Sequence, residues 1–343
     1  MLIRFLLVAA LSVVLLALET ALPVTRGVLA GRFPWPQRVD DLLQRTGVLD
    51  SDVAVRLLGD WEAALQPPMR NGEHASLMER ARREDAVVPL SHDLFGPDSA
   101  TIGLWHPDFF LDNYGTALLL AAPFAPDRVP VVLIHGINGT PRVFTNLAPE
   151  LQRAGYQPVY FFYPTGMALG SAAQQLGERL REFLGRHDVE NVVVIGHSMG
   201  GLVGKGVLNQ LKVAKTLPTW RVFISISAPF AGIASARYSE RLPRRPSSWD
   251  DLAPSSAFLQ KVQSTEFPAD LGFYLFFSAR SDRSIMAAFG NNDGVLTVDS
   301  MVASPVTAEA RDVFGFYEDH NSILGAPLVY RRLEEVLDAE LAR

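Results

Sequence analysis

Short apolar runs alternate with longer amphipathic stretches through the middle and end of the chain. Segments 169–187 and 199–211 have the spacing of helices. Continuous apolar strands separated by helices are typical of a parallel sheet that is covered on both faces. The pattern therefore predicts an α/β fold. The runs of strand length are 115–124, 129–136, 158–163, 191–196, 220–227, 271–278 and 313–316.

The alternation of strands and helices is interrupted once, at about residues 230–270. This segment is rich in proline, then basic, then amphipathic. An ordinary connection between a helix and a strand takes about 2–6 residues, and longer excursions are usually functional covers. We therefore interpret the segment as a cap or lid.

The N-terminal 24 residues contain an apolar run, 5–18, that follows Arg4. Such a segment is an export signal, a membrane anchor or, less in keeping with its position, a buried helix. We favour the anchor over a cleaved signal, because Glu19 stands where a cleavage site before residue 22 needs a small side chain. We expect three parts: the signal or anchor at 1–24, a linker and helical extension at 25–100, and the main domain at 101–343.

Composition narrows the partners of the chain and the chemistry available to it. The chain has 31 Lys and Arg against 37 Asp and Glu, a net charge of −6, and no long block of one sign. This balance argues against nucleic acid as the main partner. The absence of cysteine excludes disulfides, thiolate metal sites and cysteine nucleophiles.

A Gly-His-Ser-Met-Gly sequence at 196–200 directly follows one predicted strand and directly precedes one predicted helix. This is the setting of a nucleophile elbow, in which a strained turn presents a serine. Gly196 and Gly200 would let the backbone turn sharply on both sides of Ser198. The alternative is an ordinary glycine-rich connection between a strand and a helix. A catalytic serine, unlike such a connection, requires a base and an acid elsewhere in the chain.

A serine nucleophile needs a histidine base that is oriented by a carboxylate. In elbow hydrolases the acid and then the histidine follow the serine along the chain. His320 is the one histidine of seven that follows Ser198. For the acid we favour Asp293, because the adjacent Gly294 permits a turn, with Asp282 as the second choice. The candidates are Asp250, Asp251, Asp270, Asp282, Asp293 and Asp299.

The same mechanism needs two backbone N–H groups to bind the developing oxyanion. Met199 supplies one, as the residue after the nucleophile. Ile137, in the loop after the strand 131–134, supplies the other. The residues expected to support the site are His135, Gly136, Gly196, His197 and Gly200.

Four motifs together resemble the α/β-hydrolase superfamily, and in particular bacterial serine lipases and esterases. They are IHGINGTP at 134–141, GHSMGG at 196–201, NNDGV at 291–295 and EDHNSIL at 318–324. The similarity covers about residues 100–340. It implies an α/β-hydrolase fold with a lid after the sixth strand, and it supports Asp293 and His320 as the partners of the serine.

The resemblance implies cleavage of carboxylic esters through an acyl-enzyme, with no metal or organic cofactor. The apolar composition and the N-terminal segment favour a lipidic or otherwise hydrophobic small-molecule ester, and a membrane contact at the cell envelope. Three alternatives stay open: an acyltransferase, a peptidase or amidase, and a non-catalytic binding protein on the same fold.

Overall fold

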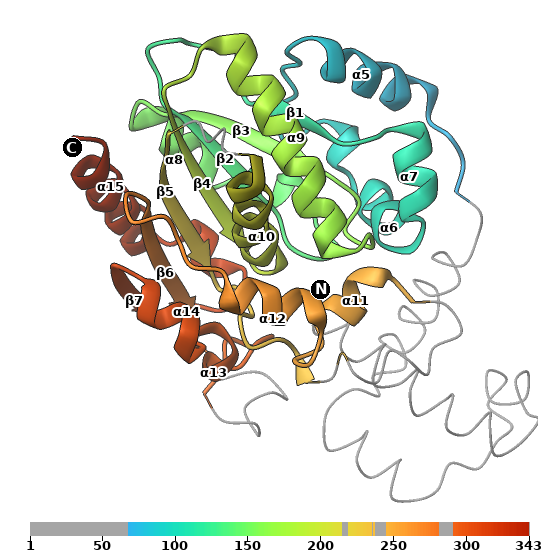
Figure 1. Ribbon diagram of the computed structural model, residues 1–343. Helices are drawn as coiled ribbons and strands as arrows, with labels where there is room; N and C mark the ends of the chain where they lie inside the picture. The colour runs from blue at the N-terminus through green and yellow to red at the C-terminus, as the bar shows by residue number, and fades with distance from the viewer. Residues whose placement is uncertain (1–67, 215–218, 235, 237–244, 281–290, 343) are drawn as a thin grey trace, which may run out of the picture. The chain divides into compact units, whose positions relative to one another are not determined.

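The structure is a computed structural model that describes residues 68–214, 219–234, 236, 245–280 and 291–342. The described helices and strands lie in one compact unit, 68–234 with 246–343 (Figure 1). The predicted signal or anchor, most of the predicted linker, part of the predicted lid and Asp282 lie outside the described residues. No helix among the described residues is both long and apolar enough to cross a membrane.

The unit is built on a seven-stranded sheet with the strand order β1-β3-β2-β4-β5-β6-β7. β1 is antiparallel to β3, and the other neighbouring strands are parallel. The mostly parallel α/β sheet predicted from the apolar runs is therefore confirmed. The strands are β1 (Ala117–Leu120), β2 (Pro130–Ile134), β3 (Gln157–Phe162), β4 (Asn191–His197), β5 (Thr219–Ile226), β6 (Gly272–Ser278) and β7 (Asp312–Phe316).

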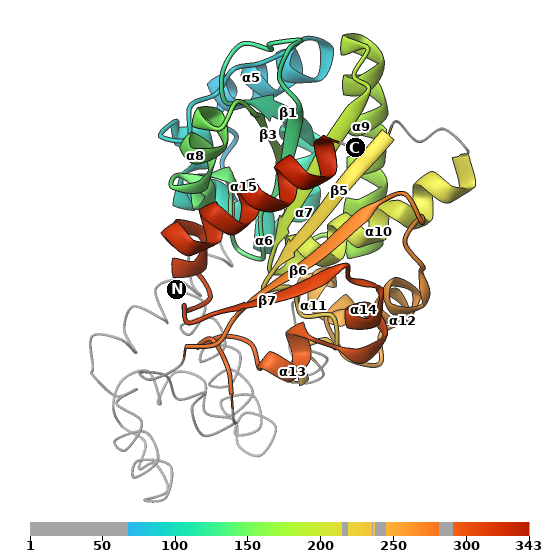
Figure 2. The ribbon, with the colours of Figure 1, turned by 90° about the vertical axis from the view of Figure 1, so that its left-hand side faces the viewer.

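Helices cover both faces of the sheet. Figure 2 shows α9 (Leu169–His187) and α10 (Met199–Ala214) on one side, and α8 (Leu147–Arg153) and α15 (Pro327–Leu341) on the other. α9 has the predicted bounds, because its apolar side chains recur at helical spacing and are buried. It ends at His187, and the next residue, Asp188, adopts a left-handed conformation with φ +51°.

The segment before the sheet packs into the same core. Met78, Val88 and Phe95 are buried in the main apolar cluster, and the Val88 N–H donates to the Leu120 carbonyl oxygen at 2.9 Å. The sequence places the start of the main domain at residue 101, whereas the compact unit begins at Pro68. Apolar side chains that meet the edge strand β1 account for this difference. The elements here are α5 (Gly72–Arg83), η1 (Asp93–Phe95), α6 (Pro97–Trp105) and α7 (Pro107–Asn113).

The predicted lid segment, 230–270, lies between β5 and β6. Its described part contains α11 (Ser247–Asp251) and α12 (Ala257–Ser264). The Leu169 N–H donates to Asp251 Oδ2 at 2.6 Å, and the rings of Trp249 and Trp105 meet edge to face at 5.5 Å. These contacts hold α11 beside the start of α9.

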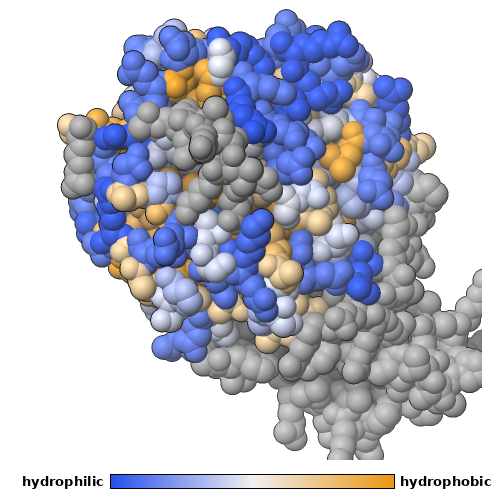
Figure 3. Space-filling view, in the orientation of Figure 1, coloured by the Kyte–Doolittle hydropathy of each residue, from blue (hydrophilic) through white to orange (hydrophobic). Residues whose placement is uncertain are grey.

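Large apolar side chains are mostly inside the unit. Figure 3 shows a largely hydrophilic surface over the described part of one face, with hydrophobic residues scattered through it. The exposed large hydrophobic residues among those described are Met69, Val87, Val143, Tyr317 and Leu328. The remaining short helices are η2 (Pro141–Phe144), α13 (Val298–Met301), α14 (Ser304–Glu309) and η5 (Ser322–Gly325).

Candidate active site

Ser198 occupies a sharp turn between β4 and α10. Its φ is +56°, a left-handed conformation that costs a non-glycine residue energy and persists only where the surroundings impose it. The Ser198 N–H donates to the Ile226 carbonyl oxygen at 2.8 Å, which fixes the turn to β5. A Cβ at Gly196 would lie 2.5 Å from the Gly200 carbonyl oxygen, and a Cβ at Gly200 would collide with the backbone of Ile134. The geometry is that of a nucleophile elbow.

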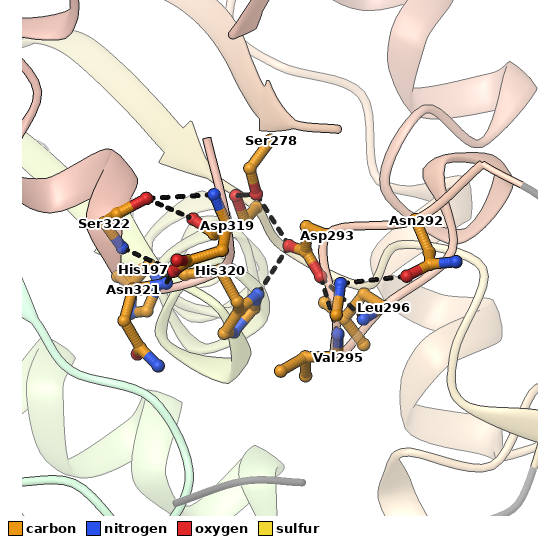
Figure 4. A network of polar contacts seen from close by, with 12 residues as sticks. His197, Ser278, Asn292, Asp293, Val295, Leu296, Asp319, His320, Asn321 and Ser322 are labelled. Atoms are coloured by element: carbon orange, nitrogen blue, oxygen red, sulfur yellow. Dashed lines mark hydrogen bonds and ion pairs between the residues drawn. The ribbon is translucent and has the colours of Figure 1, made fainter. Parts of the chain in front are cut away.

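Asp293 and His320 form a buried pair on neighbouring loops (Figure 4). His320 Nδ1 lies 2.7 Å from Asp293 Oδ2, and the His320 N–H donates to the Asp293 carbonyl oxygen at 3.0 Å. The N–H groups of Val295 and Leu296 donate to the other carboxylate oxygen at 3.0 and 2.8 Å. The carboxylate therefore fixes the ring of His320 in one orientation.

The balance of effects on Asp293 favours its charged form. Burial raises the pKa of the Asp293 carboxyl, but the charge and hydrogen bond of His320 outweigh it, together with the donors at Leu296 and Ser278. The net pKa is lower than the ordinary value for aspartate. Asp293 is thus ionised at neutral pH and accepts a hydrogen bond from His320.

His197 links the loop of His320 to the elbow. His197 Nε2 lies 2.8 Å from the His320 carbonyl oxygen, and because a carbonyl oxygen only accepts, Nε2 carries the proton. The two rings are tilted, with centroids 4.8 Å apart. Burial, helped by the charge of His320, lowers the pKa of His197 to about 3, so its ring is neutral. Since His197 directly precedes Ser198, this hydrogen bond ties the backbone of His320 to the elbow.

The loop after β2 lies directly against Ser198. A Cβ at Gly136 would lie 2.8 Å from Ser198 Cβ and 3.3 Å from Ser198 Oγ, so only glycine leaves room there. The next residues are fixed by Asn138, which has φ +49° and whose N–H donates to Thr165 Oγ1 at 3.1 Å. Within the described chain, the N–H groups of Ile137 and Met199 donate to no acceptor.

His135 supports this loop from inside the protein. It is fully buried, its Nδ1 lies 3.1 Å from the Gly136 carbonyl oxygen, and its ring stacks on Tyr163 at 4.6 Å. The Tyr163 hydroxyl donates to the His135 carbonyl oxygen at 2.8 Å. Burial lowers the pKa of His135 to about 4, against the opposing effect of the Gly136 carbonyl. His135 is therefore a neutral packing residue at neutral pH.

Two serines complete the surroundings of Asp293 and have no signal in the sequence. Ser278 Oγ donates to Asp293 Oδ2 at 2.6 Å, and Ser227 Oγ lies 2.7 Å from Ser278 Oγ. Each stands alone at the end of a strand, where serine is also a common turn residue. The second-choice acid, Asp282, lies outside the described residues, and the described residues contain no group of three or more acidic, histidine or cysteine side chains placed to hold a metal ion.

Comparison with known families identifies the class to which this fold belongs. The alpha/beta hydrolase family matches residues 131–331, a range that includes Ser198, Asp293 and His320. The chain therefore belongs to the alpha/beta hydrolase family. A comparison with curated proteins finds no significant match.

Solved structures give the same fold at low sequence identity. The mature lipase BlEst2 of Bacillus licheniformis is 18% identical, with a TM-score of 0.51 over 64% of this chain and 97% of that chain. The propeptide form of the same lipase is 18% identical, with a TM-score of 0.50 over 63% of this chain and 52% of that chain. A protein from Listeria innocua, the lin2722 product, is 18% identical, with a TM-score of 0.47 over 62% and 94% of the two chains. The two BlEst2 structures share the fold with this chain, and identity this low shows no more than that.

Proposed function

We propose that the protein is a serine hydrolase that cleaves carboxylic esters. Ser198 is the nucleophile, His320 the general base and Asp293 the carboxylate that orients it. The observation that carries the proposal is the continuous connection from Asp293 through His320 to His197, the residue next to the strained serine. A lone glycine-rich turn would have no need of such partners.

The reaction follows from the positions of these groups. His320 takes the proton of Ser198 Oγ as the oxygen attacks the ester carbonyl carbon, and the carbonyl oxygen becomes an oxyanion. The protonated ring then gives its proton to the departing alcohol, which leaves an acyl-enzyme. Water, activated by His320 in the same way, attacks the acyl group and releases the acid and free Ser198.

The N–H groups of Ile137 and Met199 are proposed to bind the oxyanion. Ile137 follows Gly136, which lies against Ser198, and Met199 follows Ser198 directly; neither N–H has an acceptor within the described chain. Met199 is also the first residue of α10, and the N-terminus of a helix favours negative charge. Fixed donors of this kind stabilise the transition state without reorganising during the reaction.

A hydrophobic acyl group is the proposed substrate feature. The chain is 48% hydrophobic, a long segment separates β5 from β6, and the structurally similar BlEst2 is a lipase. The experiment is a series of p-nitrophenyl esters of graded chain length, together with a phospholipid, assayed with the full chain. Hydrolysis that increases with chain length supports a hydrophobic ester substrate, and hydrolysis of the shortest esters alone contradicts it.

The same assay separates hydrolysis from acyl transfer. With an added alcohol as a competing acceptor, a hydrolase still releases mainly free acid. A product that is mainly the new ester would reassign the protein as an acyltransferase. Paired ester and amide substrates of one acyl group test for peptidase or amidase activity.

The cell envelope is the proposed location of the protein, through residues 1–24. The support is the apolar run 5–18 of the sequence. Membrane fractionation of the full chain and of a form that lacks residues 1–24 tests this. Recovery of both forms in the soluble fraction would contradict it.

A further inference from the structure

Asp293 receives four hydrogen bonds, two on each carboxylate oxygen. Oδ1 accepts from the N–H groups of Val295 and Leu296. Oδ2 accepts from His320 Nδ1 at 2.7 Å and from Ser278 Oγ at 2.6 Å. A carboxylate has about four lone-pair positions. The acceptor capacity of Asp293 is therefore filled, and Ser278 shares one oxygen with His320.

The direction of the serine hydrogen bonds can be assigned from donors and acceptors. An ionised carboxylate only accepts, so the Ser278 hydroxyl donates its single proton to Asp293. Ser227 Oγ, 2.7 Å from Ser278 Oγ, must then donate to it. The result is a chain from Ser227 through Ser278 to Asp293, which ends on the oxygen that holds His320.

The backbone holds both serines in the positions that this chain of hydrogen bonds requires. Ser278 is the last residue of β6, and Ser227 directly follows the neighbouring parallel strand β5. Ser227 has φ +50°, and its N–H donates to the Phe276 carbonyl oxygen at 2.8 Å. Both side chains are completely buried, so solvent does not replace the partner of either hydroxyl.

We propose that Ser278, backed by Ser227, is a positioning residue that holds Asp293 and limits how strongly the carboxylate attracts the His320 proton. This inference rests on the proposed triad. A donor on a carboxylate spreads its charge and weakens its attraction for a second donor on the same oxygen. Neither serine touches the substrate, and both act through Asp293.

We therefore predict the direction in which removal of the Ser278 hydroxyl shifts the pH dependence of activity. Asp293 Oδ2 becomes a stronger acceptor for His320 and stabilises the protonated ring, so the enzyme loses activity at a higher pH on the acid side. Among the described residues, Asp293 and His197 are the titratable side chains that face His320, and His197 is neutral, with a pKa of about 3. Glu318 and Asp319, on the same loop, bind Ser322.

The test measures the rate of covalent labelling by a fluorophosphonate between pH 4.5 and pH 8 in the full chain. This probe needs a nucleophile and base but no knowledge of the natural substrate. We expect Ser278→Ala to move the acid limb of the rate upward by about 0.5 pH. Ser278→Thr keeps the hydroxyl and should retain the wild-type limb, and Ser227→Ala should move it in the same direction by less.

Ser300→Ala is the matched control, because Ser300 is also buried and donates to the Gly232 carbonyl oxygen at 2.6 Å. It should leave the acid limb in place. If Ser278→Ala does not fold, as judged by circular dichroism, the acid limb of Ser227→Ala is the deciding measurement. A lower plateau rate with an unmoved acid limb in the folded serine variants would overturn the proposal, since that is the result of lost packing alone.

A second readout separates this inference from the proposed function. The NMR titration of the His320 ring in the Ser198→Ala background reports its protonation without any labelling. An upward move of the titration midpoint in Ser278→Ala supports the serine chain even if the wild-type protein is not labelled. An unmoved midpoint together with normal labelling overturns the serine chain and leaves the hydrolase proposal intact.

Discussion

His197 Nε2 donates a hydrogen bond of 2.8 Å to the carbonyl oxygen of His320. The two residues are 123 positions apart in the sequence, and one precedes the strained Ser198 while the other holds Asp293. The backbone of His320 is also held through its N–H, which donates to the Asp293 carbonyl oxygen at 3.0 Å. The ring of His320 is thus fixed relative to both the elbow and the carboxylate before any substrate binds.

Replacement of His197 should weaken catalysis through the position of His320. In His197→Ala the His320 carbonyl oxygen loses its donor, and a displacement of about 1 Å of a catalytic group costs about 10²-fold in rate. We expect kcat to fall by about 10–100-fold, with little change in KM. His74→Ala, on α5, is the control and should retain the wild-type kcat. A wild-type kcat in folded His197→Ala would contradict this role.

Asp293→Asn should reduce kcat by about 10³-fold or more. The amide nitrogen of asparagine cannot accept the Nδ1 proton, so the ring of His320 loses the tautomer that serves the serine. The matched control is Asp299→Asn, since Asp299 lies on the nearby α13 and is exposed. Steady-state kinetics on a p-nitrophenyl ester measure both variants. Equal losses in the two variants would argue against Asp293 as the orienting acid.

Acidification should destabilise the fold through His135. Burial lowers the pKa of His135 from 6.5 to about 4, so between these values the unfolded chain binds a proton that the folded chain does not. Stability contributed by the neutral ring is complete above pH 6.5 and is lost as the pH falls, by up to about 1.4 kcal/mol per pH unit. In His135→Asn, the contribution of residue 135 to the change of the unfolding free energy with pH should disappear.

The measurement for His135 is the free energy of unfolding in urea at several pH values from 7 to 4.5. Only the slope with pH is compared, because the substitution also changes the packing on Tyr163. A slope equal to that of the wild-type chain would show that His135 is not the group responsible.

Gly136→Ala should lower activity with a smaller effect on the fold. The new methyl group would lie 2.8 Å from Ser198 Cβ, so either the serine or the loop before Ile137 has to move. We expect kcat to fall by about 10²-fold, as for the loss of an oxyanion donor. Gly185→Ala, on α9, is the control, because no atom lies within 4 Å of its added Cβ. Full activity in Gly136→Ala would contradict the placement of this loop.

Much of the scaffold is readable from the sequence because it depends on local patterns. The helix 169–187 has its predicted bounds since burial repeats along one face, and the strands follow apolar runs. Ser198 is marked by its glycines, which the sharp turn requires, and His320 by the chain order of elbow hydrolases. These signals depend on spacing along the chain, which the sequence contains directly.

The remaining features depend on contacts between distant segments. Ser278 and Ser227 meet because β5 and β6 are neighbours in the sheet, and no spacing in the sequence marks that meeting. The packing of residues 68–100 has a related cause, since Met78 and Val88 lie in apolar stretches too short to predict which partner buries them. Their burial depends on contacts with β1, which is an edge strand of the sheet.

The central claim is that Ser198 is the nucleophile of a triad with His320 and Asp293. Its most direct test is mass spectrometry of the full chain after reaction with a fluorophosphonate, with peptide mapping of the adduct. We predict one adduct per chain, on Ser198, and none in Ser198→Ala. An adduct on another residue, or undiminished labelling of Ser198→Ala, would contradict the claim.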